Sequence, residues 1–194
     1  MRIVLASSSI TRREIMDKLK IKYDIVTSDV EEKSSKDDPR EYVKELSKNK
    51  AESVAKKVSN KNSIIVAADS IIYKDGKKYE KPKSIDEVKK NLKELSGTKN
   101  QGITGVTIID KSNGKTKTFA CVTDVYFREI SDDDIEWYVS HEENLLKKAG
   151  YSLEGIMSLF LERLDGDYYN VLGLPLGELY KGINELGYSL KDLD

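Results

Sequence analysis

The sequence predicts an α/β fold, because short apolar runs typical of buried strands alternate with segments that carry helix-capping signals. The clearest strand covers residues 64–68, a β-branched run of the kind found in strands buried on both faces. The clearest helix start is Asp38-Pro39, an N-cap residue followed by proline at the first helical position. The 194 residues suffice for one α/β domain or two small lobes sharing a cleft. We see no repeat or linker, so residues 1–194 are expected to form one domain.

The composition of the chain argues against some classes of partner and favours one compartment. The net charge of −1 provides no bulk field that would recruit nucleic acid or a membrane surface. The single cysteine, Cys121, excludes an intrachain disulfide and suits a reducing cytoplasm. No apolar run reaches the ~18 residues of a membrane span. We therefore expect a cytoplasmic protein with no membrane partner and no stable nucleic-acid binding.

The strand at residues 64–68 ends in a carboxylate, Asp69. A second apolar run follows, and Asp75-Gly76, a strong hairpin signal, then turns the chain back toward Lys81 and Pro82. A carboxylate at the end of a buried strand is costly unless it has a partner, a metal or a chemical role. From this stretch alone, a catalytic role and a structural role for Asp69 both remain open.

The N-terminal segment indicates an anion site. A short strand over residues 3–6 leads into Ser7-Ser8-Ser9, and a capping box predicts that a helix starts at Thr11. A strand, a small-residue loop and a helix N-terminus together aim backbone N–H groups at an anion. Arg12 in the first helical turn would complete a polyphosphate pocket, whereas Arg13 is expected to point to solvent.

Lys50 falls within the apolar stripe of the helix that starts after Asp38, four residues after Leu46 and four before Val54. It either extends along the apolar surface to solvent or is brought to a phosphate cleft. The acidic residues 29–32 either bind Mg²⁺ or form an ordinary solvated surface.

The remaining elements complete the α/β pattern. Ser84 begins a helix, Asn113-Gly114 turns a long antiparallel hairpin, and Ser131 caps a helix whose Trp137 is expected to pack inside. A strand is expected at residues 157–164, and Pro175 starts the last helix.

These pieces together resemble the Maf family of nucleoside triphosphate pyrophosphatases. The resemblance rests on an ordered set of short motifs that covers nearly the whole chain. They are Leu5-Ala6-Ser7-Ser8-Ser9 with Arg12, Ala68-Asp69-Ser70, Glu80-Lys81-Pro82, Leu95-Ser96-Gly97, Thr104-Gly105-Val106, Lys148-Ala149-Gly150 and Gly173-Leu174-Pro175-Leu176.

The resemblance implies a mixed α/β structure with an elongated central sheet flanked by helices and two lobes separated by a cleft. It also implies a hydrolase that converts a nucleoside triphosphate to the monophosphate and pyrophosphate with Mg²⁺ or Mn²⁺, clearing unwanted nucleotides. Many members are dimers, so the resemblance implies that a second copy of this chain is a partner in a homodimer.

The resemblance also assigns roles to residues. Asp69 matches the proton acceptor and, with Glu32, is a candidate metal ligand. Six residues match the phosphate-binding positions: Ser7, Ser8, Ser9, Arg12, Lys50 and Lys81.

Base choice stays open at Thr11, Ser70 and Glu154, because the three residues match neither branch of the family fully. Glu154 favours the branch of the family that prefers 7-methyl-GTP, whereas Ser70 favours the branch that prefers dTTP and UTP. The chain also has Ile10-Thr11-Arg12 where many members have Pro-Arg-Arg, so one usual cation is missing unless Arg13 replaces it. The alternative function is a non-catalytic nucleotide-binding regulator of cell division.

Overall fold

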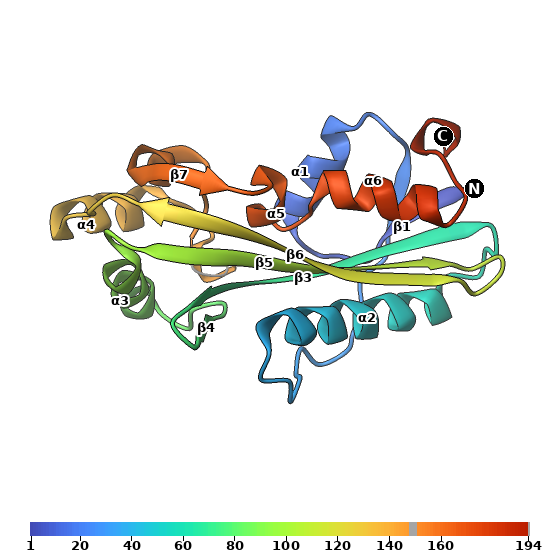
Figure 1. Cartoon of the computed structure of the whole chain (residues 1–194), viewed down its shortest axis with the longest axis horizontal. Helices are drawn as coiled ribbons and strands as arrows, with labels where there is room; N and C mark the ends of the chain where they lie inside the picture. The colour runs from blue at the N-terminus through green and yellow to red at the C-terminus, as the bar shows by residue number, and fades with distance from the viewer. Residues whose placement is uncertain (148–150, 194) are drawn as a thin grey trace.

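The computed structural model describes residues 1–147 and 151–193 and contains a seven-stranded mixed sheet with helices on both faces (Figure 1). The mixed α/β prediction is therefore confirmed. The strands are β1 (Arg2–Leu5), β2 (Tyr23–Ile25), β3 (Ser63–Lys74), β4 (Lys77–Tyr79), β5 (Lys99–Asp110), β6 (Thr116–Phe127) and β7 (Leu161–Asp165). The α-helices are α1 (Ile10–Lys18), α2 (Pro39–Lys57), α3 (Ile85–Leu95), α4 (Asp132–His141), α5 (Tyr168–Val171) and α6 (Leu176–Glu185). The 3-10 helices are η1 (Leu145–Lys147), η2 (Gly155–Phe160) and η3 (Leu190–Asp192).

The sheet has the order β2-β1-β3-β5-β6-β7, and β4 pairs with β3 beside this path. Strand β1 is parallel to β2 and β3, whereas all other pairs are antiparallel. Strands β3, β5 and β6 each have 12 residues and run along the length of the molecule in Figure 1. They form the elongated sheet that the resemblance implied.

The cleft follows from the different lengths of β1 and β3. Strand β1 pairs with β3 only as far as Leu5, which lies opposite Val66. On the same side β4 begins to pair only at Ile72. The stretch of β3 that holds Asp69 and Ser70 therefore has β5 on one side and, within the described residues, no strand on the other.

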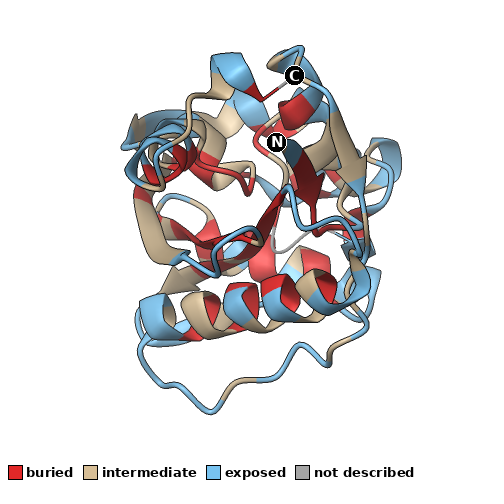
Figure 2. Cartoon of the chain, turned by 90° about the vertical axis from the view of Figure 1, so that its right-hand side faces the viewer, coloured by how far each residue is buried: buried red, intermediate tan, exposed pale blue. Residues whose placement is uncertain are grey.

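Successive side chains of a strand point to opposite faces of the sheet, so the side chains of Asp69 and Ser70 lie on opposite faces. Helix α2 covers the face of Asp69, while α1 and α6 pack on the other face, and the buried strands lie between them (Figure 2). Gly105 allows α2 to approach closely, since a Cβ at this position would lie 2.3 Å from the carbonyl oxygen of Val43.

A second lobe forms where the long strands continue past the cleft. Helices α3 and α4, Leu145 and the segment 151–160 cover that end of the sheet around one apolar cluster. Its fully buried side chains include Leu92, Leu95, Val125, Ile135, Tyr138 and Met157. The predicted pair of lobes is present, and the cleft lies between them.

Two predictions about the second lobe differ from the structure. The strand expected at residues 157–164 is present only from Leu161 onward, as β7. The residues before it form the 3-10 helix η2, whose Met157 packs in the apolar cluster of the second lobe. Trp137 does not pack inside, since 41% of it is exposed while its neighbour Tyr138 fills the core. Across the described residues, no helix has the length and apolar character needed to cross a membrane.

Candidate active site

A cleft of about 990 Å³ opens beside the uncovered stretch of β3. Its walls come from the serine loop and α1, from α2 and β3, and from the segments 142–147, 151–154 and 170–173. All eleven residues singled out in the sequence line it: Ser7, Ser8, Ser9, Thr11, Arg12, Glu32, Lys50, Asp69, Ser70, Lys81 and Glu154. Segments far apart in the sequence thus converge on one site.

Asp69 and Lys50 form an ion pair at the floor of the cleft. The side chain of Lys50 is 11% exposed and that of Asp69 is 9% exposed, so both charges are largely withdrawn from water. Lys50 also binds a Glu32 carboxylate oxygen at 2.9 Å, and Lys81 lies 3.6 Å from the other oxygen. Lys50 lies on the buried face of α2, as the apolar stripe of this helix indicated, and its ammonium group reaches the cleft rather than bulk solvent.

The cations of the cleft control the ionisation of Glu32. Partial burial alone would raise the pKa of its carboxyl group, but the hydrogen bond and charge of Lys50 oppose this, helped by Lys81 and Arg12. The pKa of Glu32 therefore lies below its usual range, and the side chain is a carboxylate at neutral pH.

The serine loop forms the N-terminus of α1. Ser9, not Thr11, is the N-cap: its hydroxyl oxygen accepts from the backbone N–H of Arg12, and the helix starts at Ile10. Ser7 is buried, and its hydroxyl accepts from the N–H of Ser9 at 3.1 Å. The residues of the serine loop and of the first turn of α1 line the cleft, so this helix N-terminus borders the cavity, as in sites that bind an anion.

Arg12 lies on the opposite face of the sheet from Lys50. Its Nε donates to the carbonyl of Gly173 at 2.8 Å, and one terminal nitrogen donates to the hydroxyl of Ser70 at 2.9 Å. Burial lowers the pKa of Arg12, against the raising effect of the Asp69 and Glu32 charges. An arginine stays cationic even so, because its ordinary pKa is above ~12.

Arg13 does not extend into solvent as predicted. It lines the cleft and donates from a terminal nitrogen to the carbonyl of Ser8 at 2.9 Å. A second guanidinium group therefore borders the serine loop, although Thr11 stands where the family resemblance expects an arginine.

Two of the residues tied to base choice are already engaged within the chain. Ser70 accepts from Arg12, and the Glu154 carboxylate lies 3.8 Å from the ammonium of Lys18 on α1. Thr11 lines the same wall. The predicted Lys148-Ala149-Gly150 motif lies outside the described residues.

Sequence reasoning assigned no role to three polar residues of the cleft wall, Tyr42, Thr104 and Asn170. Tyr42 lies on α2, and its hydroxyl donates to the Glu80 carboxylate at 2.5 Å. Burial and the Glu80 hydrogen bond raise the pKa of Tyr42, so the phenol stays protonated. Thr104 and Asn170 are fully buried and hydrogen-bonded to each other, and Thr104 also contacts the Ser70 hydroxyl. Thr104 belongs to one of the motifs of the family resemblance, but that motif assigns it no role, and no sequence pattern distinguishes Asn170 from ordinary packing residues.

The donor set fits a divalent metal that is shared with a bound phosphate. Glu32 and Asp69 both contact the Lys50 ammonium, so their carboxylates lie close together. In the described part of the chain, no three His, Cys, Asp or Glu side chains gather closely enough to hold a metal. Mg²⁺ commonly takes one or two protein carboxylates and completes its shell with phosphate oxygens and water. The protein therefore offers a partial site that a nucleotide would complete.

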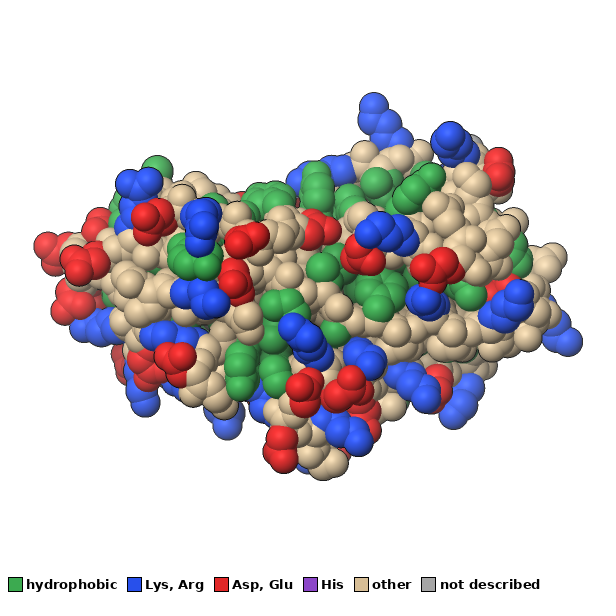
Figure 3. Space-filling model, viewed as in Figure 1, with side chains coloured by type: hydrophobic (Ala, Val, Ile, Leu, Met, Phe, Trp, Pro, Cys, Tyr) green, Lys and Arg blue, Asp and Glu red, His purple; other side chains and the backbone are tan. Residues whose placement is uncertain are grey.

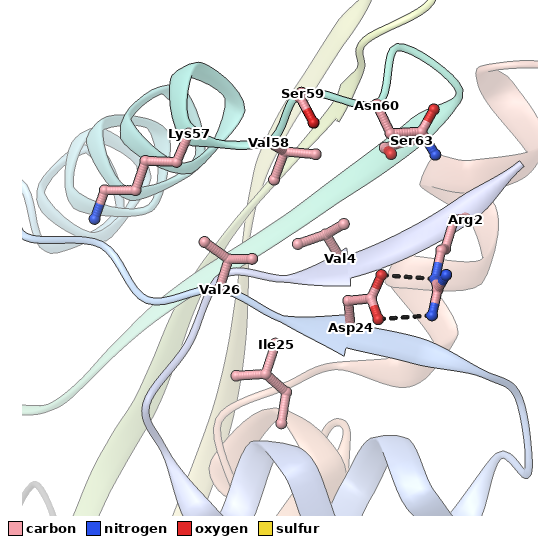
Figure 4. A pocket seen from close by; sticks show the side chains of 10 residues that line it. All are labelled: Arg2, Val4, Asp24, Ile25, Val26, Lys57, Val58, Ser59, Asn60 and Ser63. Atoms are coloured by element: carbon pink, nitrogen blue, oxygen red, sulfur yellow. Dashed lines mark hydrogen bonds and ion pairs between the residues drawn. The ribbon is translucent and has the colours of Figure 1, made fainter.

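A second hollow, of about 460 Å³, lies between β2 and the end of α2 (Figure 4). Arg2 and Asp24 neutralise each other there through a hydrogen-bonded ion pair. Lys57 pairs with Asp29. None of the predicted site residues lines this hollow, and we assign no chemistry to it.

Comparison with known proteins agrees with this geometry. The family model described as "Maf-like protein" matches residues 2–186, and the chain belongs to the Maf family. A dTTP/UTP pyrophosphatase of Pyrococcus furiosus is 43% identical over 98% of this chain and 97% of its own length. A second dTTP/UTP pyrophosphatase, from Alkaliphilus metalliredigens, is 40% identical over 92% of each chain.

Among solved structures, the Ham1 protein of Staphylococcus aureus matches 68% of this chain and 73% of its own. Its TM-score is 0.47 and its sequence identity 21%, which is too distant to bear on the site.

Proposed function

We propose that this protein is a nucleoside triphosphate pyrophosphatase that hydrolyses its substrate to a nucleoside monophosphate and pyrophosphate. The observation that carries the proposal is the buried Asp69 carboxylate, held by Lys50 in a cleft whose other wall is a helix N-terminus. A site that only bound phosphates would gain nothing from a carboxylate on its floor, because like charges repel.

In the proposed reaction, Asp69 takes a proton from a water molecule as the water oxygen attacks the α-phosphorus. The bond between that phosphorus and the oxygen bridging to the β-phosphate breaks, and pyrophosphate leaves with the electron pair. A general base of this kind contributes roughly 10²–10⁴-fold to the rate.

The cations would offset the charge of the triphosphate. Lys50 and Lys81 reach the cleft from the Asp69 side, and Arg12 from the Ser70 side, so the phosphate chain would lie between positive groups on both faces. The N–H groups of the serine loop would hold one phosphate, as helix N-termini do. Binding of phosphate to Lys50 would also release Asp69 to act as a base.

Glu32 and Asp69 are the residues that would hold Mg²⁺ or Mn²⁺. Such an ion would supply additional positive charge at the phosphates, where phosphoryl transfer accumulates negative charge.

For the substrate base we propose thymine or uracil, since the relatives that match nearly the whole chain are named dTTP/UTP pyrophosphatases. Thr11, Ser70 and Glu154 would border the base. We further propose that the chain forms a single domain and that the protein is a cytoplasmic homodimer. Light scattering on the purified protein would check whether it is a dimer.

The experiment is pyrophosphate release from dTTP, UTP, CTP, GTP and 7-methyl-GTP with Mg²⁺ or Mn²⁺, comparing wild type with Asp69→Asn. We expect release from dTTP and UTP and a loss of at least about 100-fold in the variant, with affinity for an α,β-methylene analogue retained. Asp110→Asn is the matched control, since Asp110 is also a buried aspartate but lies at the far end of β5.

Analogue binding without release of pyrophosphate from any substrate would overturn the proposal in favour of a nucleotide-binding regulator. Release of orthophosphate instead would indicate a different phosphoanhydride hydrolase.

A further inference from the structure

We propose that Thr104, a fully buried residue of β5 at the cleft wall, is a positioning residue that fixes the orientation of Arg12. The inference rests on the proposed function, in which Arg12 faces the phosphates, and adds a residue that supports it. It comes from a chain of hydrogen bonds at the cleft wall.

The chain of hydrogen bonds begins at Arg12 and ends at a backbone carbonyl. Arg12 donates to the Ser70 hydroxyl at 2.9 Å, and the hydroxyls of Ser70 and Thr104 lie 2.9 Å apart. Thr104 in turn donates to the carbonyl of Asn170 at 2.8 Å. Ser70 and Thr104 are directly opposite each other in the β3–β5 register.

The direction of each bond follows from the number of available protons. A threonine hydroxyl has one hydrogen, and that of Thr104 is committed to the Asn170 carbonyl. Ser70 must therefore donate to Thr104, which leaves the lone pairs of Ser70 for Arg12. Without the Thr104 hydroxyl, the Ser70 hydrogen would be free to rotate toward the guanidinium group, which can only donate.

Thr104 also supports the second acceptor of Arg12. The Arg12 Nε binds the Gly173 carbonyl, which lies three residues after Asn170. The Asn170 amide donates to the Gly102 carbonyl at 2.9 Å and to the Thr123 hydroxyl at 3.0 Å, so this loop is fastened to β5 and β6. The bond from Thr104 to the Asn170 carbonyl is a further attachment at the same residue.

A guanidinium group that is held by two fixed acceptors needs little reorganisation when charge develops on the substrate. Thr104→Val keeps the shape of the side chain and removes the hydroxyl. We expect kcat for the preferred triphosphate to fall by roughly 10- to 100-fold, with KM changed by less than about threefold. Thr104→Ser restores the hydroxyl and should recover most of the activity.

Thr107→Val is the matched control. Thr107 is also fully buried in β5, and its hydroxyl is hydrogen-bonded to those of Ser47 and Thr118, away from the cleft. Both valine variants should lower the melting temperature by a similar amount, but only Thr104→Val should lower kcat.

The deciding measurement repeats Thr104→Val in an Arg12→Ala background, following both pyrophosphate release and affinity for the α,β-methylene analogue. If Thr104 acts through Arg12, its substitution has little further effect on either quantity there. An undiminished loss in that background, or equal losses of kcat in the Thr104 and Thr107 variants, would overturn the inference. A wild-type protein that releases no pyrophosphate would overturn the proposed function instead.

Discussion

The ammonium group of Lys50 binds the carboxylate of Asp69, joining the middle of α2 to the centre of β3. The contact neutralises two charges that are almost fully withdrawn from water, and it also places the proposed base in the cleft. Stability and turnover should therefore both depend on this pair.

Lys50→Met tests the pair directly. The methionine retains most of the apolar stem but leaves the Asp69 carboxylate without its cation. Breaking one partner of a buried pair costs about 3–5 kcal/mol, so the free energy of unfolding in urea should fall by an amount of this order. Pyrophosphate release should fall with it. Lys48→Met is the control, because Lys48 lies on the exposed side of α2. Unchanged kcat and KM in Lys50→Met would show that the lysine is only structural.

Gly105→Ala tests how closely α2 must approach the sheet. The added Cβ would lie 2.3 Å from the Val43 carbonyl oxygen, a backbone atom that cannot rotate away. We expect a loss of about 1–3 kcal/mol in stability, as for overpacked cores, together with reduced turnover because α2 carries Lys50.

Gly177→Ala on α6 is the matched control for this substitution. The nearest atom to a Cβ there is 4.0 Å away, so the protein should be unchanged or slightly more stable. Equal melting temperatures for Gly105→Ala and wild type would contradict the close approach.

Local sequence signals predicted most of the elements that build the cleft. Asp38-Pro39 does start α2, Asp75-Gly76 does turn β3 into β4, and both turn residues have positive φ. The register of Lys50 with Leu46 was enough to place that lysine on the buried face. These signals act within a few residues of the chain, so they can be read without knowing the tertiary structure.

Contacts between distant segments could not be predicted in the same way. The N-cap of α1 is Ser9, two residues before the predicted Thr11, because the Ser9 hydroxyl accepts the hydrogen bond from the Arg12 N–H. The Gly173 carbonyl that holds Arg12 lies 161 residues away in the chain. Thr104 belongs to a motif of the family resemblance, but the motif does not reveal its contacts. Its position opposite Ser70 comes from the cross-strand register, and its bond to Asn170 comes from the packing of a distant loop.

Asp110 should govern part of the acid sensitivity of the fold. Burial raises the pKa of its carboxyl group, but hydrogen bonds from Ser112 and Tyr188 outweigh burial, and the net pKa is lowered. A carboxyl group with a lowered folded-state pKa stabilises the protein above its unfolded pKa of ~3.9, and the contribution is lost as pH falls through the folded value. Asp110→Asn should therefore be less stable than wild type at pH 7, with a difference that shrinks below about pH 4.

Urea unfolding at several pH values would measure this difference. Asp75→Asn is the control, as it removes the same charge from an exposed turn. A stability gap between Asp110→Asn and wild type that stayed constant down to pH 3 would exclude the proposed linkage.

Glu32 should determine the concentration of divalent ion that the enzyme needs for activity, because it is the more accessible of the two carboxylates around Lys50. Chelation of divalent ions should abolish pyrophosphate release from wild type, and Mn²⁺ should restore it. In Glu32→Gln the same recovery should need roughly tenfold more Mn²⁺, since one of at most two protein carboxylates is lost. Mn²⁺ binding in the presence of the α,β-methylene analogue, followed by electron paramagnetic resonance, gives a readout independent of turnover.

Glu31→Gln serves as the control because Glu31 pairs at 2.5 Å with exposed Lys33. If the Glu31 and Glu32 variants require the same Mn²⁺ concentration as wild type, Glu32 is not a ligand, and its contacts with Lys50 and Lys81 only hold the loop to the cleft.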